Sequence, residues 1–247
     1  MRIVIPVIDI HCHLLAGVDD GPSTIDESLA LAQYAVQRGI THSVVTPHIH
    51  PGRWSNEALT IRASVDILRQ ALADKKIPLI IGMSGELRVG LDALQMVANH
   101  QVPFLGKWGS NYVILIEMPH SHIPTGMPQM VQWLMQRNIR PLIAHPERNK
   151  DILRNVEKIQ PLVDAGCLFQ VTAGSIAGRF GSTARDRAVQ ILEMGIVTVL
   201  ATDAHNLKRR PPSLDEGRDA AAVIIGAEMA NRLVVDNPWK IVSCQFE

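Results

Sequence analysis

The chain has 247 residues, 47% hydrophobic and 19% charged, and this balance excludes an intrinsically disordered protein. The formal net charge is +0 and the one basic run, Lys208-Arg209-Arg210, is expected in a solvated loop or beside an anionic ligand, so charge gives no argument for nucleic-acid binding. Three widely spaced cysteines without a C-x-x-C pair, an opening segment too short for a signal peptide and no apolar stretch of transmembrane length predict a cytoplasmic protein without a membrane span. We expect one domain over residues 1–247.

Seven apolar runs rich in β-branched residues predict strands, and segments with helical periodicity follow them. The strands are expected at residues 3–13, 42–46, 79–82, 112–116, 141–144, 167–171 and 196–201. The helices are expected between Thr24, which begins a capping box with Glu27, and the stop signal Gly39, and then at residues 56–73, 91–98, 127–136, 151–164, 183–194 and 213–225, before a tail at 237–239.

Continuously apolar strands that alternate with helices are typical of a parallel sheet covered by helices. Polar residues of metal-ligand type follow nearly every predicted strand. Their strand ends must therefore converge, as they do at the carboxyl end of a barrel. We predict an α/β fold, a distorted (β/α)7 TIM-like barrel with parallel strands and outer helices.

The first strand ends in His11-Cys12-His13, where alternation directs the two imidazoles to one side and Cys12 to the other. Taken alone, this pair is explained equally well by two hydrogen-bonded histidines at a strand end. Repetition of the pattern favours a metal site. The full candidate ligand set is His11, His13, Asp20, His48, Glu86, Glu117, His145, Asp203 and His205.

So many imidazoles and carboxylates at one mouth exceed the needs of one ion and suit two or three ions with a bridging carboxylate. Nitrogen and oxygen ligands without thiolate favour Mn, Fe or Zn. Two such ions can activate water as hydroxide, so we expect hydrolysis, most naturally of a phosphate ester and without a phosphoenzyme. Cysteine-based phosphatase chemistry is excluded because no cysteine has an arginine six positions later.

Arg148 lies three residues beyond His145 and is the best candidate to clamp a phosphoryl group, although a rim salt bridge with Glu147 fits nearly as well. Weaker candidates for substrate binding lie on loops expected at the mouth, where histidines are more often merely solvated. These candidates are Arg179, Arg53 and His50. The residues expected to act in catalysis are Arg148, His48, Asp203 and His205.

The ordered series of motifs resembles one known family along essentially the whole chain. It opens with Ile8-Asp9-Ile10-His11-Cys12-His13 and Gly17-Val18-Asp19-Asp20-Gly21, and continues through Thr46-Pro47-His48, Gly85-Glu86, Ile116-Glu117, Ala144-His145-Pro146-Glu147-Arg148, Gln170–Ser175, Gly178-Arg179-Phe180-Gly181, Ala201–His205 and Asn237-Pro238. This series resembles the PHP (polymerase and histidinol phosphatase) superfamily and, within it, the manganese-dependent bacterial protein-tyrosine phosphatases of the CpsB/CapC/YwqE type.

The resemblance implies three metal ions, Mn²⁺ in the family, held by three sets of residues. These sets are His11, His13, Glu86 and Asp203; Glu86, Glu117 and His145; and Asp20, His48 and His205. It also implies phosphotyrosine on the tail of a bacterial tyrosine autokinase as substrate, and control of capsule or exopolysaccharide synthesis as the process. Two alternatives stay open: a phosphoesterase for a small phosphomonoester, such as histidinol phosphate or a nucleotide, and a non-catalytic metal-binding regulator.

Overall fold

The computed structural model describes residues 6–246, and the predicted strand residues 3–5 lie outside this range. It contains mixed α/β structure with ten strands. The strands are β1 (Ile8–Cys12), β2 (His42–Val45), β3 (His48–Ile49), β4 (Ile80–Met83), β5 (Glu86–Arg88), β6 (Gly106–Trp108), β7 (Asn111–Glu117), β8 (Ile139–Ala144), β9 (Leu168–Thr172) and β10 (Val199–Ala201).

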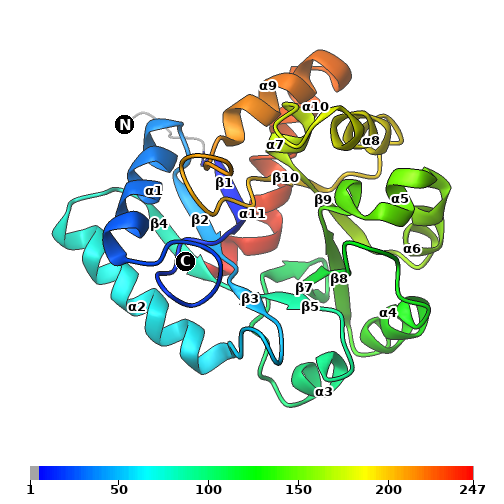
Figure 1. Cartoon of the computed structure of the whole chain (residues 1–247), viewed down its shortest axis with the longest axis horizontal. Helices are drawn as coiled ribbons and strands as arrows, with labels where there is room; N and C mark the ends of the chain where they lie inside the picture. The colour runs from blue at the N-terminus through cyan, green and yellow to red at the C-terminus, as the bar shows by residue number, and fades with distance from the viewer. Residues whose placement is uncertain (1–5, 247) are drawn as a thin grey trace.

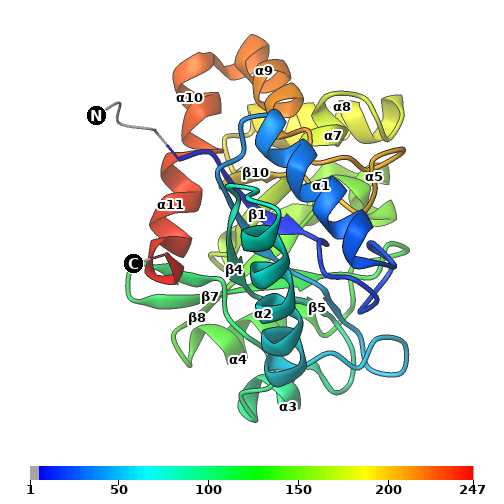
Figure 2. The same cartoon turned by 90° about the vertical axis from the view of Figure 1, so that its left-hand side faces the viewer.

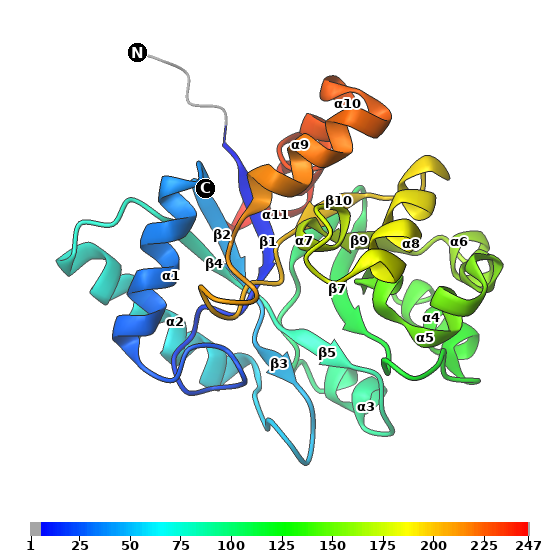
Figure 3. The ribbon, with the colours of Figure 1, turned by 45° about the horizontal axis from the view of Figure 1, so that its top comes forward.

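The strands lie in two sheets, β1-β2-β4 and β10-β9-β8-β7-β5-β3, and all of their pairings are parallel except that of β6 with β7. Chain continuity from β2 to β3 and from β4 to β5 joins the sheets on one side. On the other side, β1 meets the segment after β10, because Asp203 N donates to His11 O (2.8 Å) and His13 N donates to Ala204 O (2.8 Å). The strands therefore surround a common interior, as the predicted distorted barrel requires (Figure 3).

Helices cover the outside of the strands (Figure 1). They are α1 (Ile25–Gln37), α2 (Ala58–Asp74), α3 (Ala93–Ala98), α4 (Met127–Met135), α5 (Lys150–Arg154), α6 (Gln160–Asp164), α7 (Ala173–Ile176), α8 (Ser182–Glu193), α9 (Leu214–Ile225), α10 (Ala227–Arg232) and α11 (Asp236–Val242), with the 3-10 helices η1 (Pro146–Arg148), η2 (Val156–Ile159) and η3 (Ser243–Gln245). Among residues 6–246, no helix combines the length and the apolar character needed to cross a bilayer.

The hydrophobic core has two parts, one inside the ring of strands and one between the strands and the outer helices. In β7 the two parts alternate: Val113 and Leu115 belong to the inner cluster, and Ile114 and Ile116 to the outer one. The inner cluster includes Ile241 and Val242, both from α11. This helix lies across the molecule from the loops that follow β1 and β3 (Figure 2), so the carboxyl ends of the strands are left free for polar side chains.

A β-bulge in β1 turns the two histidines inward. Ile8 and Ile10 belong to the inner cluster, so strict alternation would send His11 outward. The pairing of β1 with β2 shifts register between Asp9 and Cys12, which inserts one extra residue. Beyond this bulge Cys12 packs in the outer cluster, and His11 and His13 face the interior together.

Three differences from the predicted elements have local causes. Pro47, which has no N–H, separates β2 from β3, and Gly85 separates β4 from β5 at a point where a Cβ would lie 2.3 Å from the side chain of Ile49. The helix predicted at 151–164 is broken into α5, η2 and α6 at Asn155, whose side chain accepts from Glu157 N. The C-terminal tail is helical, because Pro238 falls in the first turn of α11, where a missing N–H costs nothing.

We expect Gly217→Ala to destabilise the fold. A Cβ at this position in α9 would lie 2.4 Å from the Cβ and 2.5 Å from the Cα of Ala173 in α7. Overpacking typically costs about 1–3 kcal/mol and exceeds the ~1 kcal/mol that alanine gains over glycine in a helix. Urea unfolding measures the loss. Gly90→Ala is the control, because nothing lies within 4 Å of its added Cβ, and a Gly217→Ala protein as stable as this control contradicts the packing.

Candidate metal centre at the carboxyl ends of the strands

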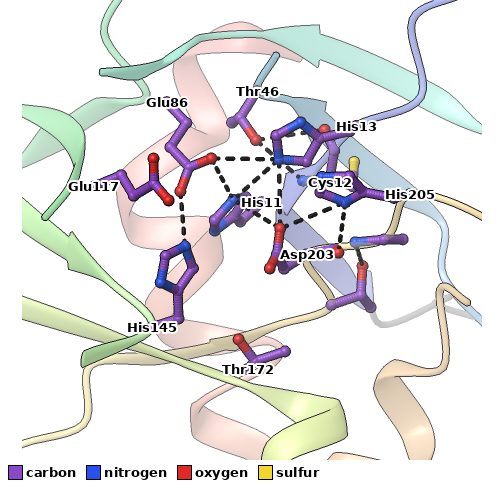
Figure 4. A network of polar contacts seen from close by, with 12 residues as sticks. His11, Cys12, His13, Thr46, Glu86, Glu117, His145, Thr172, Asp203 and His205 are labelled. Carbon is purple, nitrogen blue, oxygen red and sulfur yellow. Dashed lines mark hydrogen bonds and ion pairs between the residues drawn. The ribbon is translucent and has the colours of Figure 1, made fainter. Parts of the chain in front are cut away.

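The side chains predicted as ligands converge at the carboxyl ends of the strands, and Figure 4 labels seven of them, all except Asp20 and His48. They come from the carboxyl ends of β1, β7, β8 and β10, from the first residues of β3 and β5, which follow β2 and β4, and from the loop after β1. All are buried except Asp20, whose side chain is 43% exposed. Imidazoles and carboxylates separated by nearly two hundred residues therefore share one small volume.

Glu86 is the hub of the cluster. Its Oε2 atom lies 3.4 Å from His11 Nε2, 3.4 Å from His13 Nε2 and 2.9 Å from His48 Nδ1. Its Oε1 atom lies 2.9 Å from His145 Nε2. A single carboxylate that faces four imidazoles has the position expected of a bridging ligand.

Asp203 forms a second junction on the opposite side of the two β1 histidines. Its Oδ1 atom lies 3.3 Å from His11 Nε2 and 3.4 Å from His13 Nε2. Its Oδ2 atom accepts from the guanidinium groups of Arg148 and Arg210. One oxygen thus faces the imidazoles while the other is held by two cations.

The backbone is left-handed at two of these positions, with φ of +34° at His145 and +52° at Asp203. Such conformations are uncommon for residues other than glycine and cost about 1–3 kcal/mol where they are strained. At His145 the turn carries the imidazole back toward Glu86, although the preceding residue, Ala144, already faces inward. Two of the five described non-glycine residues with positive φ are therefore ligand residues of the cluster.

The donor atoms fall into groups that each suit an ion. Within each group the atoms lie within 4.8 Å of one another, and the groups are His13, Asp20, His48 and His205; His11, His145 and Asp203; His11, His13 and Glu86; and His48, Glu86 and Glu117. The third set implied by the resemblance lies within the first group, with Asp20 Oδ1 at 3.4 Å from His48 Nε2 and 3.3 Å from His205 Nε2.

Unpartnered buried atoms indicate that the cluster fits a set of cations. In the part of the chain that the structure describes, Glu86 Oε2, Asp203 Oδ1, His205 Nε2 and His48 Nδ1 are buried and have no hydrogen-bond partner. Such groups are costly to bury unless an ion or another polar group satisfies them. Such atoms also occur outside the ligand set, for example Ser43 Oγ and Arg187 Nε, but these four lie together in the cluster.

Neighbouring charges and burial shift part of the set toward the protonation states of metal ligands, whereas nearby carboxylates outweigh burial and raise the pKa of His11, His13 and His48. Burial raises the pKa of Glu86 and of Asp203, but His11 and His48 around the first and Arg148 and Arg210 around the second lower both well below the usual range. Burial and Arg148 lower the pKa of His145 to about 3. Anionic carboxylates and a neutral imidazole are the forms that bind divalent cations.

Asp19 orients His13 from outside the cluster. Its Oδ2 atom lies 2.6 Å from His13 Nδ1 and accepts from His48 N (3.0 Å), and its Oδ1 atom accepts from Gly21 N (2.9 Å). His13 Nε2 is thereby turned toward Glu86 and Asp203. Gln170 acts in the same way on His11, since its Oε1 atom lies 2.8 Å from His11 Nδ1.

We expect Asp19→Asn to weaken metal binding by about 10- to 100-fold, because a partner that orients a histidine ligand commonly contributes that much. Calorimetric titration of the metal-free protein with Mn²⁺ measures the change. Asp26→Asn, an exposed position in the first turn of α1, is the control. Equal affinity in the two variants would show that Asp19 does not position His13.

A cavity of about 150 Å³ opens beside the cluster. Three of the predicted substrate-binding residues, Arg148, Arg53 and His50, line it together with Asp20, His48, Glu117 and His145. The rim salt bridge between Arg148 and Glu147 considered from the sequence is not formed: Arg148 pairs with Asp203, and Glu147 accepts from Thr172 N and Ser175 Oγ.

Arg179 does not reach this cavity. Its guanidinium donates to Glu216 of α9, with Nε at 3.0 Å from Oε2, and both side chains are about one-third exposed. The prediction that it binds substrate is therefore not supported by its position. The loop after β9 directs this side chain toward the helical layer.

Four residues at the mouth were not assigned a role from the sequence. Arg88 pairs with Glu117 (2.8 Å), Arg210 pairs with Asp203, His120 stacks on His145 with centroids 5.9 Å apart, and Trp54 stacks on His48 with centroids 4.8 Å apart. Arg88 follows Glu86 by two residues on the same strand, so period-2 alternation was the available signal. Arg210 belongs to the basic run, which therefore supplies one side chain to the site.

The fold and this cluster define the class: an α/β protein whose parallel strands carry a candidate multinuclear metal centre at their carboxyl ends. The family model for capsular polysaccharide synthesis, CpsB/CapC, matches residues 7–243, and the chain belongs to this family.

Several named relatives are similar in sequence to most of this chain. The tyrosine-protein phosphatase YwqE of Bacillus subtilis is 36% identical over 83% of this chain and 79% of its own length. The tyrosine-protein phosphatase CpsB of Streptococcus pneumoniae is 31% identical over 97% of this chain and 100% of its own length. A solved structure, reported with YwqE and CpsB as unique metal-dependent tyrosine phosphatases, is 33% identical, covers 96% of this chain and 95% of its own, and superposes with a TM-score of 0.89.

Proposed function

We propose that this chain is a metal-dependent protein-tyrosine phosphatase that removes phosphate from the tyrosine-phosphorylated tail of a bacterial kinase, in the control of capsule or exopolysaccharide synthesis. The observation that carries the proposal is the convergence of the predicted ligands in one cluster, four of which, Asp20, His48, Glu117 and His145, line the adjoining cavity. Relatives that match most of this chain are named tyrosine-protein phosphatases. The report of the similar solved structure describes two of them, YwqE and CpsB, as metal-dependent.

The residues proposed to hold the ions are those of the three sets described above, with Glu86 shared between two of them. Bound divalent cations would supply a water of lowered pKa and neutralise charge on the phosphoryl group. Manganese is the proposed metal, and the nitrogen and oxygen donors also suit iron or zinc. The cytoplasmic location and the single-domain organisation expected from the sequence stay predictions.

Arg148 is proposed to hold the phosphoryl oxygens. Its side chain is 11% exposed, lines the cavity and is fixed by Asp203 on one side and by the ring of Phe180, 5.0 Å from the guanidinium carbon, on the other. A planar guanidinium fixed in this way offers paired donors to a phosphate. His48, Asp203 and His205 are the further residues proposed to act at the reacting group.

The tyrosine leaving group needs little proton donation from the protein. A tyrosine phenol has a pKa of about 10, far below that of an alkyl alcohol, so its oxygen departs with little help from a general acid. The site therefore needs residues that position phosphate more than a strong proton donor.

The size of the cavity favours a protein substrate over a small phosphomonoester. Sites that enclose small ligands measure about 300–1,000 Å³, whereas this cavity measures about 150 Å³. It fits the end of a side chain and leaves the remainder of the substrate outside. A phosphotyrosine on a protein tail meets that requirement.

The test compares three substrates with purified protein and Mn²⁺: a tyrosine-phosphorylated kinase-tail peptide, histidinol phosphate and a nucleotide. We expect the highest kcat/KM for the peptide and no turnover after chelation with EDTA. Faster turnover of either small molecule supports the small-substrate alternative. Bound metal without turnover of any substrate supports the non-catalytic regulator.

A further inference from the structure

Four guanidinium groups line the mouth of the cavity, and one of them differs from the rest. Arg148 and Arg210 pair with Asp203, and Arg88 pairs with Glu117 at 2.8 Å. Arg53 lines the same cavity, is exposed, and forms no ion pair within residues 6–246. Its charge is therefore uncompensated at the outer edge of the site.

Arg53 is nevertheless held in place. Its guanidinium carbon lies 3.9 Å from the centre of the Trp54 ring, and Trp54 is stacked on His48 with an interplanar angle of 9°. The turn that carries both residues is closed by His50 N donating to Trp54 O (2.9 Å) and Trp54 N donating to His50 O (2.8 Å), with Gly52 at φ +83°. Less conformational freedom is then lost when Arg53 meets a ligand.

We propose that the turn His50–Trp54 is a subsite for an anionic side chain next to the phosphotyrosine, with Arg53 as the contact. This inference rests on the proposed function and specifies its substrate class. The phosphoryl group enters the cavity, where the metal ligands and Arg148 surround it, so a cation at the rim is left for a second negative group on the same peptide. A glutamate or aspartate carboxylate and a second phosphotyrosine share that chemistry.

The test uses phosphotyrosine peptides that differ only in the flanking residues: glutamate, glutamine or a second phosphotyrosine. For the wild-type protein at low ionic strength we expect kcat/KM to be about 3- to 10-fold higher for the glutamate-flanked than for the glutamine-flanked peptide. This ratio should shrink as salt is added. A larger ratio for the doubly phosphorylated peptide than for the glutamate-flanked one identifies phosphate as the preferred anion.

Arg53→Gln should reduce the ratio to near 1, and Arg53→Glu should invert it. The matched control is Arg137→Gln, because Arg137 is also exposed and its guanidinium carbon also lies 3.9 Å from a tryptophan ring, that of Trp133, but before the amino end of β8. The control should keep the wild-type ratio, and a thermal melt verifies that each variant is folded.

A wild-type ratio near 1, or an unchanged ratio in Arg53→Gln and Arg53→Glu, overturns the subsite. These results are distinct from failure of the proposed function, in which the metal-loaded wild-type protein releases no phosphate from any of the peptides. In that case the subsite is overturned as well.

Discussion

Replacing Glu86 by glutamine is expected to abolish both metal binding and phosphate release. The substitution keeps the shape of the side chain but removes the charge that faces His11, His13 and His48 through Oε2 and His145 through Oε1. A neutral amide is a poor ligand for a divalent cation and cannot bridge two of them. We expect kcat/KM to fall by at least about 10³-fold, the loss typical for removal of a principal stabilising group.

The readouts are bound Mn²⁺ by elemental analysis and kcat/KM on a phosphotyrosine peptide. Glu147→Gln is the matched control, because Glu147 is equally buried but faces Thr172 and Ser175 instead of the imidazoles. The control should retain its metal. A Glu86→Gln protein with full metal content and activity is incompatible with the assignment of Glu86 as the shared ligand.

Replacing Arg148 by alanine is expected to lower kcat/KM by about 10²- to 10³-fold while the metal content stays close to that of the wild type. Arg148 lines the cavity, and the carboxylate it binds, Asp203, keeps a second guanidinium partner in Arg210. Loss of Arg148 would therefore remove the proposed phosphate contact without freeing Asp203. Arg148→Lys should recover part of the loss, because it restores the charge but not the paired donors.

Elemental analysis separates this role from a structural one. If Arg148→Ala loses metal as Glu86→Gln does, Arg148 acts by holding Asp203 and not by binding phosphate. Arg179→Ala gives the comparison for the arginines named from the sequence. Its side chain is engaged by Glu216 outside the cavity, so the loss of kcat/KM should be far smaller than for Arg148.

The presence of ligand-type residues after nearly every predicted strand indicated which residues meet. Parallel strands bring their carboxyl ends to one edge, and side chains alternate along each strand. Glu117 shows this most simply: it follows Val113 and Leu115 on the inner side of β7 without a break. His48 and Glu86 pair in register on β3 and β5. The position of Glu117 follows from the apolar pattern alone, whereas the short strands β3 and β5 that carry His48 and Glu86 were not predicted.

Other positions depend on backbone features that the apolar pattern does not reveal. The bulge in β1 is required to bring His11 to the same side as Ile8 and Ile10, and left-handed turns aim His145 and Asp203. The pairing of His11 with His13 was predicted correctly, because both side chains face the interior and Cys12 between them faces the outer cluster. The bulge that places Ile8, Ile10 and His11 on the same side of β1 could only be seen in the structure.

Residues that act through a neighbour were the hardest to find from the sequence. Asp19 stands beside Asp20 in one loop, and only the fold distinguishes the residue that faces the cluster from the one that supports His13. Arg179 and Arg53 were indistinguishable as loop arginines, yet one pairs with α9 and the other lines the cavity. Loop side chains are placed by tertiary contacts, which short-range sequence patterns do not encode.

The most direct test is metal reconstitution of the chelated, dialysed protein, with bound Mn²⁺ and phosphate release from a phosphotyrosine peptide measured on the same samples. We predict that two or three ions bind per chain and that activity rises with their binding and disappears again with EDTA. A protein that binds no Mn²⁺, Fe or Zn, or one that hydrolyses the peptide equally well with and without chelator, would contradict the assignment of the strand-end cluster as a metal centre.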